Sequence, residues 1–141
     1  MRLEGLLGQE RVAAQLTAEA ASGRLAHAYL FVGPQGCGRG SAALALFRAL
    51  NCENRDDPPC GVCASCRRAM AGQHEDLLVL APPNDQASAQ IKVEEVREMV
   101  RALSFAPFGG GWRLVLIRQA GQLNPSSANA LLKTLEEPPP R

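Results

Sequence analysis

Apolar residues recur along this chain either with the spacing of one helix face or in short continuous runs. Helical spacing predicts four helices, over residues 8–23, 41–50, 92–103 and 126–137. Continuous apolar runs predict three short buried strands, over residues 28–32, 76–81 and 112–117. Because strands alternate with helices, we expect an α/β fold in which helices cover both faces of a parallel sheet.

The same spacing indicates which residues face the core and where the helices end. Gly23 should end the first helix, and Asn124 and Pro125 should begin the last one, which the prolines at 138–140 end. The predicted apolar stripes are Val12, Leu16 and Ala20; Leu44, Phe47 and Leu50; Val93, Val96, Val100 and Leu103; and Ala128, Leu131, Leu132 and Leu135. Residues 82–90 and 105–111 should form loops.

A glycine-rich turn connects the first strand to the second helix. Its spacing fits the phosphate-binding pattern G-x-x-x-x-G-K-[ST], with Gly33 as the first glycine and Gly38 as the second. Arg39 stands where a lysine would reach the terminal phosphates, Gly40 stands where a hydroxyl would hold magnesium, and Ser41 comes one position late. The alternative is a tight turn that binds nothing, although backbone amides still permit weak phosphate binding. The degenerate nucleotide-binding positions are Gly33, Gly36, Gly38, Arg39, Gly40 and Ser41.

The third strand ends without the acidic residues that a phosphate-loop ATPase needs. An aspartate that holds magnesium is expected there, but the strand is followed by Arg118 and Gln119. Ligands bind at the carboxyl ends of parallel strands, so this segment and the glycine turn should lie side by side. Two separate losses of magnesium ligands predict that the chain does not hydrolyse ATP, and we assign it no catalytic residue.

Four cysteines in the polar segment 51–73 have the spacing of a metal site. The pattern C-x7-C-x2-C-x2-C can place four thiolates around one ion, which predicts a structural zinc with no open position. A redox pair is the alternative, but it needs no third and fourth cysteine. We interpret Cys37 as a small loop residue, His27 as a packed or capping histidine, and His74 as a surface residue. The expected ligands are Cys52, Cys60, Cys63 and Cys66.

Composition narrows the class of protein. The 141 residues are 46% hydrophobic and 21% charged, as in one ordinary globular domain. No apolar run is long enough to span a membrane, and residues 1–10 do not have the pattern of a signal peptide, so we expect a cytoplasmic protein. A net charge of +1 does not indicate nucleic-acid binding over the whole surface.

Several motifs stand in an order that resembles one protein family. They are GQ at 8–9, HAYLF at 27–31, the glycine turn, NC at 51–52 with the cysteine cluster, VEEVR at 93–97 and ALLKTLEEPP at 130–139. Together they resemble the N-terminal AAA+ module of bacterial clamp-loader subunits of DNA polymerase III. The resemblance implies a three-layer P-loop NTPase fold with a zinc-binding insertion at 51–73. It also implies that residues 1–141 end before the last strands, leaving a strand position to be filled by further chain or by a second copy.

The resemblance also implies a role. The gamma/tau subunits of this family carry an intact phosphate loop and acidic pair, and the delta-prime subunits commonly lack them, so Arg39, Gly40, Arg118 and Gln119 favour the delta-prime branch. We therefore expect a non-hydrolysing stator in a hetero-pentamer with gamma/tau and delta, which places the sliding clamp on primed DNA. Zinc is the expected cofactor, and ATP with magnesium is not.

Two other functions remain open at this point. One is an ATP-hydrolysing subunit of the gamma/tau type, which intact magnesium ligands would support. The other is a zinc-dependent nucleic-acid-binding module. Arg55, Arg67 and Arg68 lie in the cysteine segment, but no aromatic residue accompanies them.

Overall fold

The computed structural model describes residues 1, 3, 6–84, 86 and 88–139. The chain divides into two compact units, Met1–Leu77 and Leu78–Arg141. No helix in the described part of the chain is long and apolar enough to cross a membrane.

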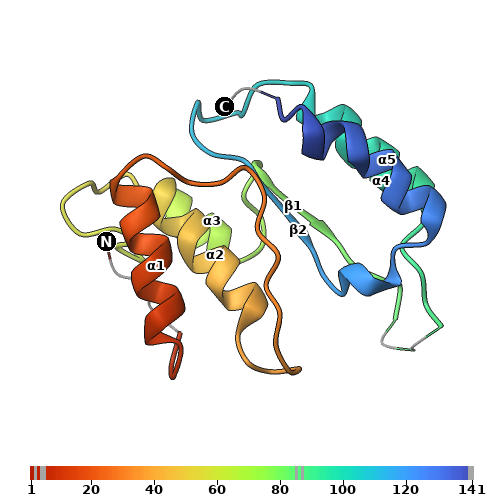
Figure 1. Ribbon diagram of the computed structural model, residues 1–141. Helices are drawn as coiled ribbons and strands as arrows, with labels where there is room; N and C mark the ends of the chain where they lie inside the picture. The colour runs from red at the N-terminus through yellow and green to blue at the C-terminus, as the bar shows by residue number, and fades with distance from the viewer. Residues whose placement is uncertain (2, 4–5, 85, 87, 140–141) are drawn as a thin grey trace. The chain divides into compact units, whose positions relative to one another are not determined.

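Among its described residues, the first unit contains three helices joined by irregular segments with several turns. They are α1 (Glu10–Ala21), α2 (Arg39–Leu50) and α3 (Ala64–Met70), and α2 packs against both of the others (Figure 1). Gly23, with a φ of 67°, follows the end of α1 as the sequence predicts. The core of this unit contains Leu3, Leu6, Leu16, Ala42, Ala45, Leu46 and Ala49, with Val12 and Ala20 packed against it.

The buried residues of α2 cover more of the helix surface than the apolar stripe predicted from the sequence. Phe47 is buried, but Leu44 and Leu50 are only half-buried. Four alanines, at positions 42, 43, 45 and 49, are buried instead. Alanine lets a neighbouring segment approach the helix backbone closely. The predicted stripe included only large apolar residues, so these buried alanines were not predicted.

The segment 28–32 was expected to be a buried strand, and that prediction is wrong. It has no strand conformation in the structure, and the side chains of Leu30 and Val32 are 80% and 84% exposed. An apolar run makes a segment suitable for a sheet, but a strand forms only where another strand supplies hydrogen bonds. Among the described residues, the one sheet contains two strands, and neither includes this segment.

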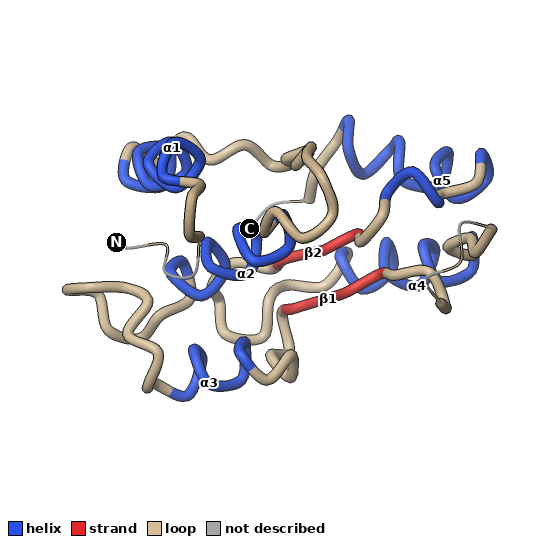
Figure 2. The backbone as a smooth tube through the Cα atoms, turned by 90° about the horizontal axis from the view of Figure 1, so that it is seen from below, coloured by secondary structure: helices blue, strands red, loops and turns tan. Residues whose placement is uncertain are grey.

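The second unit is built around a short parallel sheet. Strand β1 (Leu77–Leu80) pairs with β2 (Leu114–Ile117), and α4 (Val93–Leu103) connects them along the chain (Figure 2). A short 3-10 helix, η1 (Ala120–Gln122), leads from β2 to α5 (Pro125–Glu136). Helices α4 and α5 lie side by side (Figure 1). Their shared core contains Ile91, Val96, Met99 and Leu131, with Leu78, Leu80, Val115 and Ile117 of the strands packed against it.

The end of α4 is capped by the residue that directly precedes β2. The guanidinium of Arg113 donates hydrogen bonds to the carbonyl oxygens of Ala102 at 2.6 Å, Phe105 at 2.9 Å and Ala106 at 3.1 Å. The last carbonyls of a helix have no partner within the helix, and they favour a positive charge. Arg113 therefore fixes the turn that follows α4.

The beginning of α5 follows the sequence prediction, but its buried face does not. The side-chain oxygen of Asn124 accepts a hydrogen bond from the backbone amide of Ser127 at 2.8 Å, and Pro125 begins the helix. Leu131 is buried, whereas Leu132 and Leu135 are 49% and 46% exposed, and Ala128 is exposed as well. The helix turns Ser127 inward instead. Of the prolines expected to end it, Pro140 lies outside the described residues.

Ser127 is buried because its hydroxyl is the hydrogen-bond donor to a buried backbone carbonyl. Its Oγ donates a hydrogen bond to the carbonyl oxygen of Ile91 at 2.7 Å, and neither residue has exposed surface. Ile91 also forms a parallel bridge with Leu123 and donates its amide to Gln122 at 3.1 Å. A buried carbonyl without a donor is unfavourable, so this bond sets the rotation of α5.

Candidate metal centre and phosphate loop

The four cysteines of the expected site come together in space. The Sγ atoms of Cys52, Cys60, Cys63 and Cys66 all lie within 4.8 Å of one another. Four sulfurs at the corners of a tetrahedron with metal–sulfur bonds of about 2.3 Å are about 3.8 Å apart. The cluster therefore needs only a small contraction to surround one ion, and its donor set fits zinc.

Local backbone structure directs amide groups at these sulfurs. The amide of Cys60 donates to Sγ of Cys52 at 3.3 Å, that of Cys63 to Sγ of Cys60 at 3.4 Å, and that of Cys66 to Sγ of Cys63 at 3.4 Å. The last bond is also the N-cap of α3. Gly61, with a φ of 73°, makes the turn that brings these amides round. Such bonds stabilise thiolates, which are the form that binds a metal.

The thiols of the cluster differ in how readily they ionise. Backbone amides of Cys63 and Val62 lower the pKa of Cys60 to about 7. Burial raises the pKa of Cys66 to about 12. Burial disfavours the charged form of this thiol, and a bound cation would favour it.

His74 was expected on the surface, and that prediction is wrong. The residue is 8% exposed, and its ring meets the ring of Phe47 edge-on with centroids 4.9 Å apart. Nδ1 accepts a hydrogen bond from the amide of Asp76 at 3.1 Å, and Nε2 lies 3.2 Å from Oγ of Ser65. Because Nδ1 accepts, the neutral ring carries its proton on Nε2 and donates to Ser65.

His74 therefore helps to fix the position of α3, the helix that carries the candidate ligand Cys66. Ser65 precedes the candidate ligand Cys66 in α3, and its backbone amide donates to the Glu53 carboxylate at 3.1 Å. The ring of His74 thus ties α3 both to α2 and to the segment that enters β1. Sequence reasoning missed this role because an isolated histidine has no periodic signal; its place three residues before the apolar strand β1 was the available indication.

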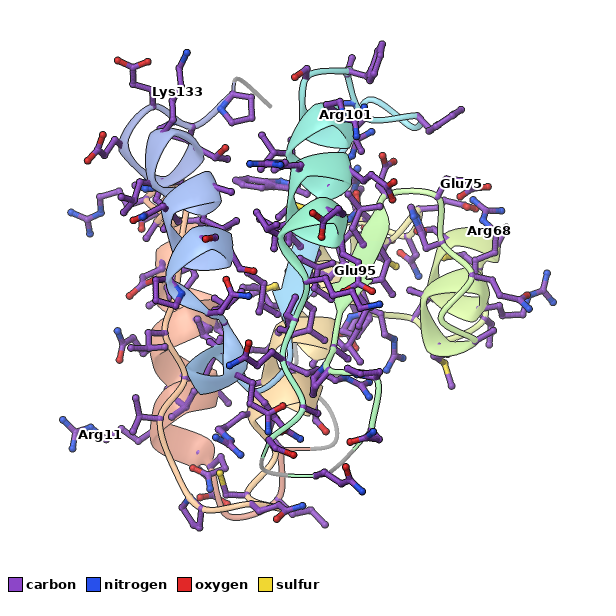
Figure 3. All side chains as sticks on the ribbon, turned by 90° about the vertical axis from the view of Figure 1, so that its right-hand side faces the viewer. Arg11, Arg68, Glu75, Glu95, Arg101 and Lys133 are labelled. Carbon is purple, nitrogen blue, oxygen red and sulfur yellow. The ribbon has the colours of Figure 1, made fainter. Side chains whose placement is uncertain are left out.

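The surface next to His74 carries an ion pair. Arg68 of α3 and Glu75 lie beside each other (Figure 3), with 3.2 Å between Nε and the carboxylate oxygen. The backbone amide of Glu75 and then the Arg68 charge lower the pKa of this carboxyl group. Both side chains are substantially exposed, so the pair contributes little to stability.

The glycine turn forms a loop that leads directly into α2. Gly36 and Gly38 have φ angles of 83° and 90°, and Gly38 is the N-cap of the helix. A Cβ on Gly33 would lie 2.8 Å from Sγ of Cys37, so the cysteine side chain occupies the space that this glycine leaves. Cys37 is thus a small loop residue, as its position suggested.

The helix begins two residues earlier than the sequence predicted, at Arg39. Arg39 and Ser41 are exposed on its first turn, and Gly40 lies between them. A Cβ on Gly40 would meet nothing within 4 Å. Packing therefore does not require glycine there.

Neither residue after β2 is acidic, and both are exposed. The amide of Arg118 extends the ladder by donating to the carbonyl of Leu80 at 2.8 Å. Gln119 has a φ of 54°, a left-handed conformation, and its carbonyl accepts the amide of Gln122. The expected closeness of this turn to the glycine loop stays a prediction.

Comparison with known proteins gives a consistent answer. A sequence model of the family described as "DNA polymerase III, delta subunit" matches residues 8–141. Among curated relatives, the DNA polymerase III subunit tau of Escherichia coli K12 is 41% identical over 135 residues, which are 95% of this chain and 20% of that protein. The subunit tau of Bacillus subtilis is 36% identical over 139 residues, 98% of this chain and 24% of that protein.

A relative from a second branch is equally similar. The DNA polymerase III subunit delta' of Yersinia pestis is 41% identical over 126 residues, 89% of this chain and 36% of that protein. The chain therefore spans 20% to 36% of the length of these relatives. The chain belongs to the family of DNA polymerase III subunits that includes tau and delta'.

Proposed function

We propose that this chain is the N-terminal AAA+ module of a clamp-loader subunit of the delta-prime type, which does not hydrolyse ATP. Sequence identity does not separate the two branches, because a tau and a delta' relative are both 41% identical to the chain. The proposal therefore depends on individual residues in the two segments that would bind magnesium.

The observation that carries the proposal is the loss of both magnesium anchors. On the first turn of α2, Arg39 and Gly40 replace the lysine and hydroxyl of an active loop, although the space at Gly40 is open. After β2, Arg118 and Gln119 replace the acidic pair. Packing does not require glycine at position 40.

The proposed fold is the three-layer P-loop arrangement of AAA+ modules. The loop between residues 33 and 38 with the helix that follows it, and the β1–α4–β2 unit, support this proposal because such an arrangement would contain both.

The proposed cofactor is one structural zinc ion, held by Cys52, Cys60, Cys63 and Cys66. Zinc would supply cross-linking of the segment between α2 and α3, which contains polar loops and little core of its own. Four thiolates complete the coordination shell, so this ion would have no catalytic position. Nucleotide with magnesium is not proposed as a cofactor.

The proposed partners are the gamma/tau and delta subunits of a hetero-pentamer. Through that complex the chain would act on the sliding clamp and primed DNA, in the cytoplasm. A stator contributes a fixed interface, while its neighbours bind and hydrolyse ATP. The chain's own lack of hydrolysis would then be harmless.

Nucleotide binding by the purified chain tests the proposal first. A fluorescent ATP analogue should show no magnesium-dependent binding to the chain. The double variant Arg39→Lys with Gly40→Thr should gain at most weak binding, because Arg118 and Gln119 still provide no second anchor. The open space at Gly40 makes threonine sterically acceptable.

A reconstituted clamp loader provides the functional test. A loader in which the longer subunit carries the double variant should load clamps at a rate within about twofold of the unmodified loader. A twofold change corresponds to about 0.4 kcal/mol in the activation free energy. Omitting the subunit should abolish loading. Tight magnesium-dependent ATP binding by the unmodified chain, or faster loading by the variant, would favour an ATP-hydrolysing subunit of the gamma/tau type.

A further inference from the structure

One buried donor next to the cysteine cluster has no partner. The Nε atom of Arg48, in the last turn of α2, is shielded from solvent and makes no hydrogen bond with any part of the chain that the structure describes. An N–H group buried in this way is unfavourable unless something accepts from it. The surroundings of Arg48 show which negative charge its guanidinium can compensate.

Two parts of Arg48, its backbone carbonyl and its guanidinium, lie close to the segment that carries the cysteines. Its carbonyl oxygen lies 3.9 Å from Sγ of Cys66. Its Nη2 atom lies 3.8 Å from the place that a Cβ on Gly61 would occupy, and Gly61 belongs to the turn between Cys60 and Cys63. The half-buried guanidinium thus lies against the same turn that directs amides at the sulfurs.

The charge of the proposed centre calls for a cation at this place. Four thiolates and one divalent zinc ion carry a net charge of about −2, and half-buried charge of one sign needs nearby compensation. Polar groups around the ligands of a metal commonly orient them and tune the affinity. Arginine also offers several N–H donors from one planar group.

Other arginines of the segment are less suited to this role. Arg55 and Arg67 have exposed side chains, and Arg55 donates to the carbonyl of Leu50 at 3.2 Å. Arg68 is also exposed and pairs with Glu75. Arg48 is the arginine whose buried N–H is unused among the described residues.

We propose that Arg48 is a positioning residue of the metal centre, which places its positive charge beside the turn that holds the tetrathiolate and so raises the affinity for zinc. The inference goes beyond the proposed clamp-loader function and rests only on the proposed metal centre. It also gives a reason for the partly buried position of a charged residue near the end of α2.

Zinc affinity measured by competition with a chromophoric chelator tests this role. Arg48→Gln should weaken zinc binding by about 10- to 100-fold, the range that outer-shell changes produce. Arg67→Gln is the matched control, because it removes the same charge from an exposed site in the same segment, and it should change the affinity by less than about threefold. Arg48→Lys should recover part of the loss, because it restores the charge without the planar group.

A spectroscopic measurement separates this role from a merely structural one. In the cobalt-loaded protein, the sulfur-to-metal charge-transfer band should move to longer wavelength in Arg48→Gln and stay in place in Arg67→Gln, because the thiolates lose a nearby positive charge. Circular dichroism shows whether each variant is folded. Arg48→Lys supplies the comparison if the glutamine variant unfolds.

The possible outcomes distinguish the two levels of the proposal. If the unmodified chain binds zinc and Arg48→Gln binds it equally well, the role of Arg48 is refuted while the metal centre stands. If Arg48→Lys binds zinc as weakly as Arg48→Gln, charge is not the cause and the role is also refuted. If the unmodified chain binds no zinc, the metal centre and the role of Arg48 fall together, and the clamp-loader proposal is untouched.

Discussion

Replacing His74 by alanine should destabilise the first unit more than any surface change. The ring loses its hydrogen bonds to Ser65 and to the amide of Asp76, each contributing about 1 kcal/mol. It also loses its edge-on contact with Phe47, about 0.5–1.5 kcal/mol, and leaves a space in the core. We expect a loss of about 3–4 kcal/mol in the free energy of unfolding, a large part of the usual total of about 5–15 kcal/mol.

Urea unfolding followed by circular dichroism measures this change. Zinc must be held at one fixed concentration, because a ligand that binds the folded state shifts the midpoint by mass action. The midpoint should fall while the slope with urea stays constant. The chain has two histidines, and His27→Ala is the matched control. Because His27 is exposed, its replacement should cost less than about 1 kcal/mol.

A double-mutant cycle tests whether the hydrogen bond to Ser65 is responsible. Ser65→Ala and His74→Ala remove the same bond, so the two losses should fail to add by at least about 0.5 kcal/mol. A loss below about 1 kcal/mol for His74→Ala alone would refute the burial and bonding described for this ring. Full additivity would show that the two side chains act independently.

Two further predictions concern the metal and the acid response. Cys63→Ser should reduce zinc from about one equivalent per chain to almost none by elemental analysis. A variant that kept its zinc would contradict the four-cysteine site. Because serine can still cap α3, that helix should persist. The Tyr29 hydroxyl, 2.5 Å from the Glu19 carboxylate, and then Gln15 lower the pKa of Glu19. A lowered pKa favours the folded state above the unfolded value of about 4.5, and this contribution is lost as the pH falls through the folded value. Tyr29→Phe should therefore raise the pKa of Glu19 in an NMR titration, and an unchanged value would show that the hydrogen bond is absent in solution.

The amino-acid sequence by itself determined the features that depend on near neighbours in the chain. Gly23 ends α1 and Asn124 caps α5 because both effects act within one helical turn. The cysteine spacing was sufficient because three ligands lie within seven residues, and a tight turn must bring their sulfurs together. The α/β alternation of the second unit also followed from apolar periodicity alone.

Only the tertiary structure decided the features that depend on distant partners. Helix α3 has only seven residues and buries Ser65, Cys66 and Ala69, so it has no stripe of large apolar residues from which it could be predicted. The segment 28–32 has the composition of a strand but no strand to pair with among the described residues. The interior position of His74 likewise depends on acceptors and donors that other segments supply.

The buried face of α5 shows the physical reason most clearly. Apolar spacing favoured a stripe through Leu132 and Leu135, yet Ser127 faces inward because the carbonyl of Ile91, 36 residues away, needs a hydrogen bond. Arg113 in the same way caps a helix that precedes it by about ten residues. Hydrophobic burial can be anticipated from the order of residues, whereas the satisfaction of buried polar groups depends on which segments the fold brings together.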